Sequence, residues 1–537
     1  MTYSLLDLPV ELIEIVIRNL FLVKWSPDPS FSLSNQTKND LHSCALTCLA
    51  LFEPAIRLLW QDVELFQLLK LFPNLQRNEA GVYVLTSDLD DASWKRFDLY
   101  SIHVKNLSVH ATVNVVDSAV WGRLALSRPG PMLSNLTYVY CLDSHSDCTF
   151  FDRRMFLISS HLKKVYLDVL GGKFSKLLPY LSFVQQEACL DRLVIVHHRG
   201  DNSGFDPLPI VAQFKDLRSL RLVFSDSEIT SLDFGCLCQL QKLIDLELFI
   251  DGNIAVRTLG DGVPKAENLA CLEVYLQSPD ILPVVLRMYE ASPVENLLVT
   301  FVEFHDAELF QTTLDIIPLK WLQTLTVLEI SYQDGMGPIQ MVNLPPVSLS
   351  SLIGSLYDAR GLEELTLSGL SKDVVYVADS DIFNICNAWP NLTRLIIDID
   401  VQTQIRISGV DQLPTVSSFY ALSAHCPALK TVQIPFYPGD IPPIDNDKSR
   451  ALASSPGPPH RLRYLFLYVP EADFGDCNLT ADGSSLVAYH LNLAFPLLNT
   501  VEVKNFDMGD IWSPTRIRWD AVNTVIGICH DVRRRYA

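Results

Sequence analysis

One apolar spacing recurs through most of this chain and limits what it can fold into. From about residue 100 onward, an apolar residue is followed three and five positions later by two more, which gives the pattern L-x-x-L-x-L. Five successive copies begin at Leu162, Leu190, Leu217, Leu243 and Leu269, so their first residues lie 28, 27, 26 and 26 positions apart. A period of this length fits one strand and one helix. The sequence therefore predicts an α/β solenoid, with parallel strands on the concave face and helices on the convex face.

The repeat continues toward the C-terminus at wider spacing, and about fourteen copies are expected in all. Several linkers carry helical spacing, and prolines end three of these helices two residues before the next strand's first leucine. An apolar pattern over 517–532 predicts a helix that caps the C-terminal end. We therefore expect three parts: a helical domain at 1–75, the solenoid at 76–510 and a capping helix at 511–537. The other nine copies begin at Val104, Leu136, Val294, Leu325, Leu362, Leu392, Leu429, Leu462 and Leu498.

Composition and charge narrow the class of protein. Apolar residues make up 48% and charged residues 19%, which excludes a disordered chain. A net charge of −20 repels phosphate backbones and anionic membranes, so neither nucleic acid nor a membrane is expected as a partner. No secretory signal and no run of 18 apolar residues is visible. The sequence predicts an intracellular protein of the cytoplasm, the nucleus or both, not a secreted one.

The N-terminal residues carry a helical pattern instead of the repeat. Pro9 suits the first position of a helix, and a second helix is expected from Leu41 to Phe52, with Pro54 opening a third. Three short helices cannot bury a large core, so a partner or the adjoining solenoid is expected to supply contacts. The apolar stripe of the first helix consists of Leu12, Ile13, Val16, Ile17 and Leu20.

The repeats resemble the leucine-rich-repeat family. Residues 425–434, which read His-Cys-Pro-Ala-Leu-Lys-Thr-Val-Gln-Ile, are most similar to its cysteine-containing subclass. Ser225, Asp251 and Gln277 stand where that family normally has Asn or Cys. The residues therefore leave open how successive turns are held together.

The N-terminal segment resembles an F-box. The match begins at the Leu8-Pro9 pair, continues through Asp40-Leu41 and ends at Arg57-Leu58-Leu59-Trp60. In that family such residues dock on a Skp-type adaptor of a cullin-RING ubiquitin ligase. The alternative reading is a helical cap that only shields the first repeat. The resemblance implies a docking face formed by Leu8, Pro9, Leu12, Ile13, Val16, Leu41, Leu46 and Cys48.

The variable positions of the strands are expected to face the concave side of the solenoid, where side chains can contact a target protein. Carboxylates beside aromatic rings suit a basic partner, because rings supply contact area and charges steer the encounter. The candidate target-binding residues are Asp245, Glu247, Phe249, Glu273, Tyr275, Tyr464, Phe466 and Tyr468.

No residue pattern indicates catalysis, a cofactor or a metal. Gly335-Met336-Gly337 lacks the third glycine of a dinucleotide fingerprint, and Cys236 and Cys238 have no second pair to complete a zinc site. We therefore expect a non-enzyme that is the substrate-recognition subunit of a Skp-cullin-F-box ubiquitin ligase. A ligase-independent scaffold or inhibitor is the main alternative. An enzyme with its site in the loops 334–346 or 437–460 is the third.

Overall fold

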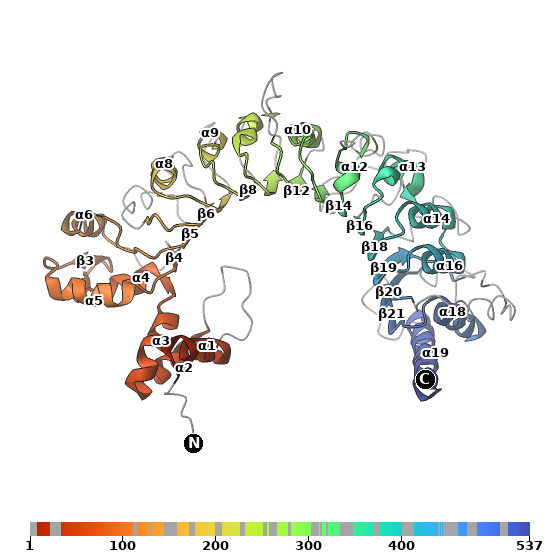
Figure 1. Cartoon of the computed structure of the whole chain (residues 1–537), viewed down its shortest axis with the longest axis horizontal. Helices are drawn as coiled ribbons and strands as arrows, with labels where there is room; N and C mark the ends of the chain where they lie inside the picture. Colours follow the sequence, from red (N-terminus) through yellow and green to blue (C-terminus); the bar gives the residue numbers. More distant parts are fainter. Residues whose placement is uncertain are drawn as a thin grey trace. The chain divides into compact units, whose positions relative to one another are not determined.

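The computed structural model divides the chain into two units, Met1–Ala266 and Glu267–Ala537 (Figure 1). We call them the first unit and the second unit. The structure describes residues 8–21, 34–110, 116–128, 130–143, 158–170, 178–198, 207–225, 231–250, 255–256, 266–277, 281–301, 311, 314–317, 320–332, 347–369, 375–399, 413–438, 441, 443, 460–469, 481–504 and 514–536.

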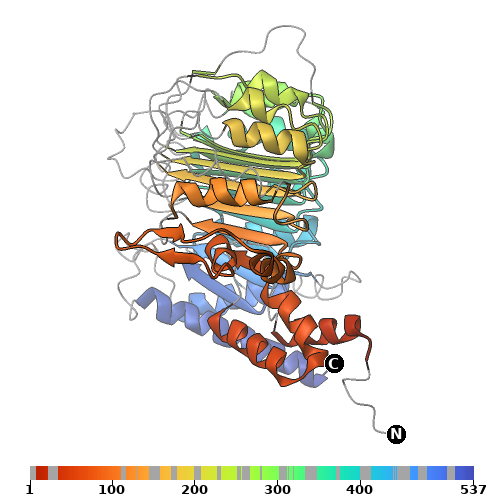
Figure 2. The ribbon, with the colours of Figure 1, turned by 90° about the vertical axis from the view of Figure 1, so that its left-hand side faces the viewer.

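Each unit contains a sheet of parallel strands with helices on one side, and Figure 2 shows the strands of the first unit stacked one above another. The sheet of the first unit runs in the order β1 (Asp62–Glu64), β4 (Asn106–His110), β5 (Tyr138–Asp143), β6 (Lys164–Leu170), β7 (Arg192–His198), β8 (Ser219–Ser225) and β10 (Asp245–Ile250). That of the second unit runs in the order β12 (Cys271–Leu276), β13 (Asn296–Phe301), β14 (Val327–Tyr332), β16 (Glu364–Ser368), β18 (Arg394–Asp398), β19 (Thr431–Pro435), β20 (Tyr464–Tyr468) and β21 (Thr500–Lys504).

The registers place equivalent positions of successive repeats side by side. Leu193 pairs with Leu220, which pairs with Leu246, and each of these side chains is at most 1% exposed. The leucines that define the repeat thus share one interior, because side chains alternate between the two faces of a strand. All fourteen predicted strands are present, in sequence order and parallel. The predicted α/β leucine-rich-repeat solenoid is therefore confirmed.

Helices fill most of the links between strands. In the first unit they are α1 (Val10–Phe21), α2 (Asn35–Thr47), α3 (Leu49–Leu59), α4 (Leu65–Leu69), α5 (Asp91–Ser101), α6 (Ser118–Ser127), α8 (Leu178–Glu187), α9 (Leu208–Val211) and η4 (Phe234–Gln239). In the second unit they are α10 (Leu282–Met288), α12 (Trp321–Thr324), α13 (Leu349–Ile353), η6 (Gly354–Asp358), α14 (Asp379–Ala388), α16 (Val416–His425), α18 (Ala481–Ala494) and α19 (Pro514–Tyr536).

Short two-stranded sheets accompany the long parallel strands. In the first unit β2 (Leu75–Arg77) pairs antiparallel with β3 (Tyr83–Leu85), and β9 (Ser231–Leu232) pairs parallel with β11 (Ala255–Val256). In the second unit β15 (Val347–Ser348) pairs parallel with β17 (Val375–Tyr376). They lie in the links between repeats, outside the main sheets.

Main-chain hydrogen bonds hold successive repeats together just before each strand. The carbonyl of Thr137 accepts from the amides of Lys163 and Lys164, at 2.8 and 3.0 Å. The carbonyl of Glu295 accepts in the same way from Thr326 and Val327. A carbonyl oxygen has two lone pairs and can satisfy both donors. This arrangement needs no particular side chain, which explains how the repeats stack although Asn and Cys are missing from the family's usual positions.

The N-terminal part differs from the expected pattern in two places. The third helix begins at Leu49 instead of at Pro54, because Cys48 has extended backbone angles that separate it from α2. Pro54 lies inside α3 and costs that helix one hydrogen bond, since proline has no amide hydrogen. In addition, the strand β1 lies within the range 1–75 that was expected to be helical. The domain boundary at residue 75 stays a prediction.

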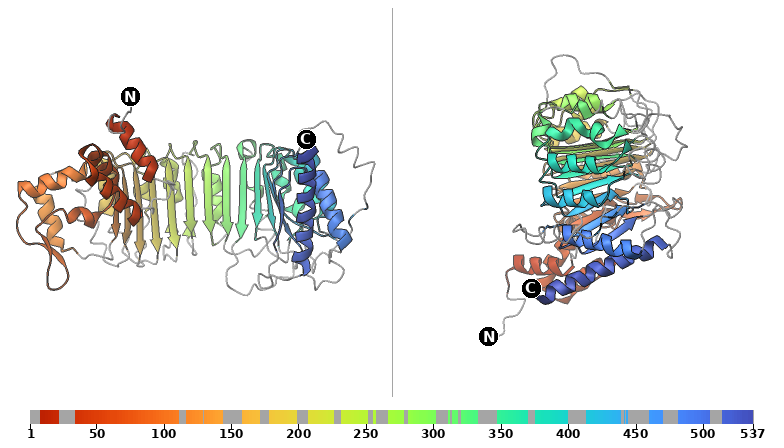
Figure 3. Two further views of the ribbon diagram at one scale, coloured as in Figure 1. Left: turned by 90° about the horizontal axis from the view of Figure 1, so that it is seen from below. Right: turned by 90° about the vertical axis from the view of Figure 1, so that its right-hand side faces the viewer.

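The C-terminal helix lies against the last strand of the second sheet. α19 packs beside α18 and β21 (Figure 3). Its Asn523 side chain accepts from the amide of Val501 at 2.9 Å and donates to the carbonyl of Val501 at 2.8 Å. Val501 is the second residue of β21, so one amide side chain satisfies the outward main-chain groups of the final strand at this position.

A buried histidine should make the second unit sensitive to acid. His460 donates from Nε2 to the carbonyl of Cys426 at 2.8 Å, while Nδ1 accepts from the amide of Leu462. Burial lowers the pKa of His460 below its ordinary value of 6.5. The unfolded chain therefore takes up a proton near pH 6.5 that the folded chain does not, so stability falls as the pH drops from 6.5 toward the folded pKa.

The expected loss is at most about 1.4 kcal/mol for each pH unit below 6.5. Melting temperatures measured between neutral pH and pH 5 would show it, because His460→Gln should flatten the curve while keeping a donor and an acceptor. Equal pH dependence of the wild type and this variant would show that His460 does not contribute.

Candidate functional site

The first candidate surface lies on the three-helix bundle formed by α1, α2 and α3. Pro9 is exposed, and the side chains of Leu8, Leu12 and Leu46 are 38%, 45% and 72% exposed. Val16 and Cys48 are half-buried. Six of the eight docking residues implied by the F-box resemblance are thus at least partly accessible on the bundle.

The other two implied docking residues are in the core. Ile13 is 3% exposed and Leu41 is 1% exposed, and both pack with Ile17 and Leu58. The apolar stripe of α1 is wider than the two neighbouring helices can bury. Ile13 and Ile17, which are four residues apart, therefore face inward and Leu12 does not. The docking face is corrected accordingly: Ile13 and Leu41 hold the bundle together.

Two apolar side chains missed by the sequence analysis extend this surface. Ile15 is 52% exposed and Leu49 is 89% exposed. Leu12 and Ile15 are three residues apart, which puts them on one side of α1, and Leu8 precedes the first residue of that helix. This second stripe overlaps in sequence with the buried one, so periodicity alone does not separate them.

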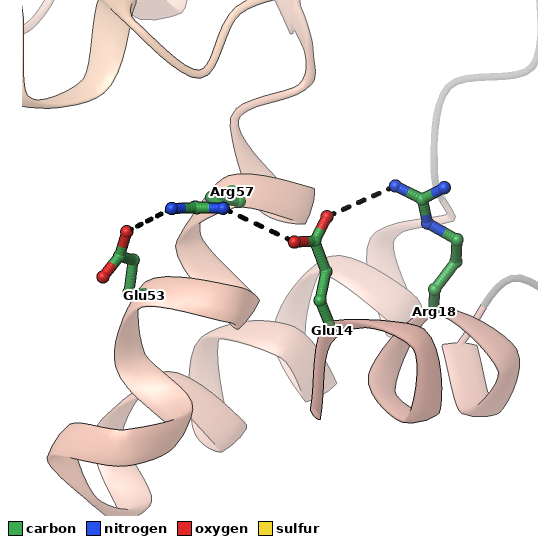
Figure 4. Close-up of polar contacts among 4 residues, drawn as sticks. All are labelled: Glu14, Arg18, Glu53 and Arg57. Atoms are coloured by element: carbon green, nitrogen blue, oxygen red, sulfur yellow. Dashed lines mark hydrogen bonds and ion pairs between the residues drawn. The ribbon is translucent and has the colours of Figure 1, made fainter. Parts of the chain in front are cut away.

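A chain of ion pairs connects α1 with α3 (Figure 4). Arg57 lies 3.6 Å from Glu14 and 2.5 Å from Glu53, and Arg18 lies 3.3 Å from Glu14. The hydrogen bond that Arg57 donates to Glu53, together with the charges of Glu53 and Glu14, raises the pKa of Arg57 above its ordinary value. These groups are partly exposed, so they add little stability and mainly fix how α1 lies against α3.

The second candidate surface is the open face of each sheet, the face away from the helices. Its residues alternate with the buried leucines, as the pattern of burial in β10 and β13 shows. Positions that are equivalent in successive repeats form columns across the strands. In the first unit one column runs from Tyr138 through Lys164 and Arg192 to Ser219.

The candidate residues on β10 do not behave alike. Asp245 is exposed. Glu247 is 3.0 Å from Arg221 on the neighbouring strand, so its charge is already compensated. Phe249 is half-buried against an apolar cluster that includes Val194, Val196 and Val223. Of the three, Asp245 is the carboxylate best placed to meet a basic partner.

In the second unit, four of the five candidate residues are accessible on the open face. Glu273 is exposed, Tyr275 and Phe466 are half-buried, and Tyr464 is 50% exposed. Tyr468 is only 4% exposed, so its assignment to the target-binding surface is corrected. It packs with Leu413 and Tyr437, which come from outside the strand, and Gln433 donates to its hydroxyl.

The open face of the first unit also carries a group that the sequence analysis did not single out. We call it the basic-aromatic patch: Tyr138, Tyr140, Lys164, Tyr166 and Arg192. The rings of Tyr140 and Tyr166 are 4.6 Å apart, and Lys164 pairs in register with Arg192. Burial, and then the two neighbouring tyrosines, raise the pKa of Tyr138 well above its ordinary value. The same repeat positions that gave the other candidates would have identified these residues.

Metal sites, cavities and membrane-spanning helices are the other features that could indicate a function. Among the residues that the structure describes, no group of three or more His, Cys, Asp or Glu side chains is arranged to hold a metal ion. A small cavity between α10 and β13 is lined by apolar side chains, among them Leu282, Leu286 and Val299. No helix in the described ranges is both long and apolar enough to span a membrane. The loops 334–346 and 444–459 lie outside the described residues.

Similarity to known proteins was found among solved structures. No protein-family model matches the sequence, and no curated protein matches it. Among solved structures, a TLR13–ssRNA13 complex aligns with a TM-score of 0.34 and 13% identity, covering 77% of this chain and 57% of that one. The mouse RP105/MD-1 complex aligns with a TM-score of 0.32 and 15% identity, covering 75% of this chain and 64% of that one. The Drosophila Toll–Spätzle complex aligns with a TM-score of 0.32 and 9% identity, covering 78% of this chain and 54% of that one.

This chain thus spans less than two thirds of the length of those structures. TM-scores this low carry no argument, so the fold assignment rests on the strand registers alone.

Proposed function

We propose that this protein is a non-enzymatic recognition subunit of a Skp-cullin-F-box type ubiquitin ligase. The three-helix bundle docks on a Skp-type adaptor, and the open face of the sheets holds a target protein. It requires no cofactor, metal, nucleic acid or membrane. It works inside the cell, in the cytoplasm or the nucleus, where such ligases act.

The observation that carries this proposal is the exposed apolar stripe of α1. Leu12 and Ile15 lie on one side of the twelve-residue helix α1, whose other side is buried in the bundle, and Leu8 is exposed two residues before this helix begins. Exposed apolar side chains that gather in one place are typical of protein-interaction sites. The Leu8-Pro9 pair, on which the F-box resemblance rests, comes directly before this helix.

The ion pairs of Arg57 support docking by presenting this stripe in a fixed orientation. Glu14 reaches toward α3. Of its two neighbours in sequence, Ile13 then faces the core of the bundle and Ile15 faces the solvent. A surface that is already ordered costs less entropy on binding. The catalytic contribution of the subunit is then proximity, since holding a target beside a conjugating enzyme makes the transfer effectively intramolecular.

Replacing Leu12 and Leu46 by aspartate should weaken adaptor binding about thirtyfold or more, because it buries two charges in an apolar interface. Co-purification of the full chain with a Skp-type adaptor, followed by titration, measures this. Leu126→Asp is the matched control, because Leu126 is 86% exposed on α6, outside the bundle. If wild type fails to bind the adaptor, or all variants bind equally, the docking role is wrong.

One observation favours a second function, that of a ligase-independent scaffold or inhibitor. Ile13 and Leu41, two of the eight implied docking residues, are committed to the core of the bundle. The open face of the sheets does not depend on them. A chain that binds a target through this face while binding no adaptor would support this alternative.

A further inference from the structure

The basic-aromatic patch contains two neighbouring cations. Lys164 on β6 and Arg192 on β7 are partners in the register, and both are exposed. In the part of the chain that the structure describes, neither pairs with a carboxylate. Like charges that lie directly opposite on adjacent strands are destabilising. An anion placed between them would relieve this repulsion.

Other cations on the open faces are treated differently. Arg221 pairs with Glu247 on the next strand of the first unit. Arg394 pairs with Glu364 on the next strand of the second unit. In a chain with a net charge of −20, carboxylates are plentiful. Among the described residues of these faces, two adjacent cations without a carboxylate partner are therefore the exception, and they indicate a site for an anionic group from outside.

Aromatic side chains border the two cations. Tyr138 is the register neighbour of Lys164, and its hydroxyl is buried without a hydrogen-bond partner among the described residues. The rings of Tyr140 and Tyr166 are in contact and tilted by 36° to each other, and His110 lies edge-on to Tyr140 at 6.2 Å. Tyrosines supply large contact area at low entropic cost, together with a polar group. The surroundings of the cations thus suit a chain with apolar groups between its charges.

We propose that the basic-aromatic patch binds an acidic peptide segment of a partner protein, with carboxylates at Lys164 and Arg192 and apolar or aromatic side chains on Tyr140 and Tyr166. A nucleic acid is disfavoured, because the negative charge of the whole chain repels a long polyanion, whereas a short acidic segment contacts mainly the patch. This inference rests on the proposed function in one respect, namely that the acidic segment belongs to the target protein. It adds the chemical nature of the segment that is bound.

The test uses full-length chain and a fluorescent random copolymer of glutamate and tyrosine, with binding followed by anisotropy. We expect binding that weakens at high salt and a loss of about tenfold or more in the double variant K164E/R192E. The matched control is K95E/R96E, which makes the same change in net charge at two exposed cations on α5 and should bind like wild type. A lysine–tyrosine copolymer and single-stranded oligo-dT complete the set of probes.

A single variant separates binding from folding. Lys164→Glu should raise the melting temperature, because it replaces a like-charge pair by an ion pair with Arg192, and it should still lose copolymer binding. Adaptor co-purification in parallel tells the two proposals apart, since K164E/R192E should keep the adaptor and L12D/L46D should keep the copolymer.

Four results would overturn the inference. These are no binding of the glutamate–tyrosine copolymer by wild type, equal binding by K164E/R192E, an equal loss in K95E/R96E, or oligo-dT binding with the same dependence on Lys164 and Arg192. The last result would assign the patch to nucleic acid.

Discussion

Replacing Asp381 by alanine should lower the free energy of unfolding of the second unit by about 2–4 kcal/mol. Asp381 is only 1% exposed. Its Oδ1 accepts from the amide of Ser350 at 2.9 Å, and its Oδ2 accepts from the amide of Ala378 at 2.8 Å. Ser350 belongs to α13 and Ala378 precedes α14, so one carboxylate joins the helices of two successive repeats. Alanine would leave two donors without a partner.

Denaturant unfolding measures this loss, and Asp358→Ala is the matched control, because Asp358 is an exposed aspartate at the end of η6. Asp381→Asn should lie between the two, since it keeps one acceptor but turns an amino group toward the second donor. If Asp381→Ala is as stable as Asp358→Ala, the link between the repeats has no energetic weight.

Gly369→Ala should destabilise the second unit by about 2–5 kcal/mol, because strain and steric overlap add. Gly369 follows β16 and has a φ of +65°, which L-residues with a side chain rarely adopt. A Cβ there would lie 2.2 Å from the carbonyl oxygen of Tyr332 and 3.0 Å from its carbonyl carbon. Both are main-chain atoms of β14 and cannot move aside as a flexible side chain would.

Gly354→Ala is the control for this substitution. A Cβ at Gly354 meets nothing within 4 Å, and no positive φ is involved. Alanine should there be neutral or stabilising by up to about 1 kcal/mol, because it restricts the unfolded chain. The melting temperatures of both variants test this prediction. A Gly369→Ala protein with the melting temperature of the wild type would mean that the turn after β16 adjusts without strain.

The strands were predictable because the repeat encodes a burial pattern that the structure reproduces. Leu162, Leu217 and Leu269 begin three of the predicted copies and are all fully buried. The first strand was not predicted, since Asp62-Val63-Glu64 contains a single apolar residue. It forms because β4 supplies the pairing partner, and a short sequence does not contain that information.

The candidate sites were less predictable because their residues depend on neighbours far apart in the chain. Tyr468 is buried by Leu413 and Tyr437, neither of which belongs to its strand. Leu12 and Ile13 are adjacent and equally apolar, so only the packed bundle distinguishes the exposed residue from the buried one. The pairing of Glu247 with Arg221 was within reach, however, because the two positions are 26 residues apart, which is one repeat.

The contact between Asn523 and Val501 has a consequence for self-association. A parallel sheet ends in a row of main-chain donors and acceptors, onto which a strand from another molecule can add. With the amide and carbonyl of Val501 engaged by α19, an incoming strand would first have to displace that helix. This contact therefore protects the edge against end-to-end polymerisation. The Asn523→Leu variant is the one in which we expect filaments or concentration-dependent aggregates first.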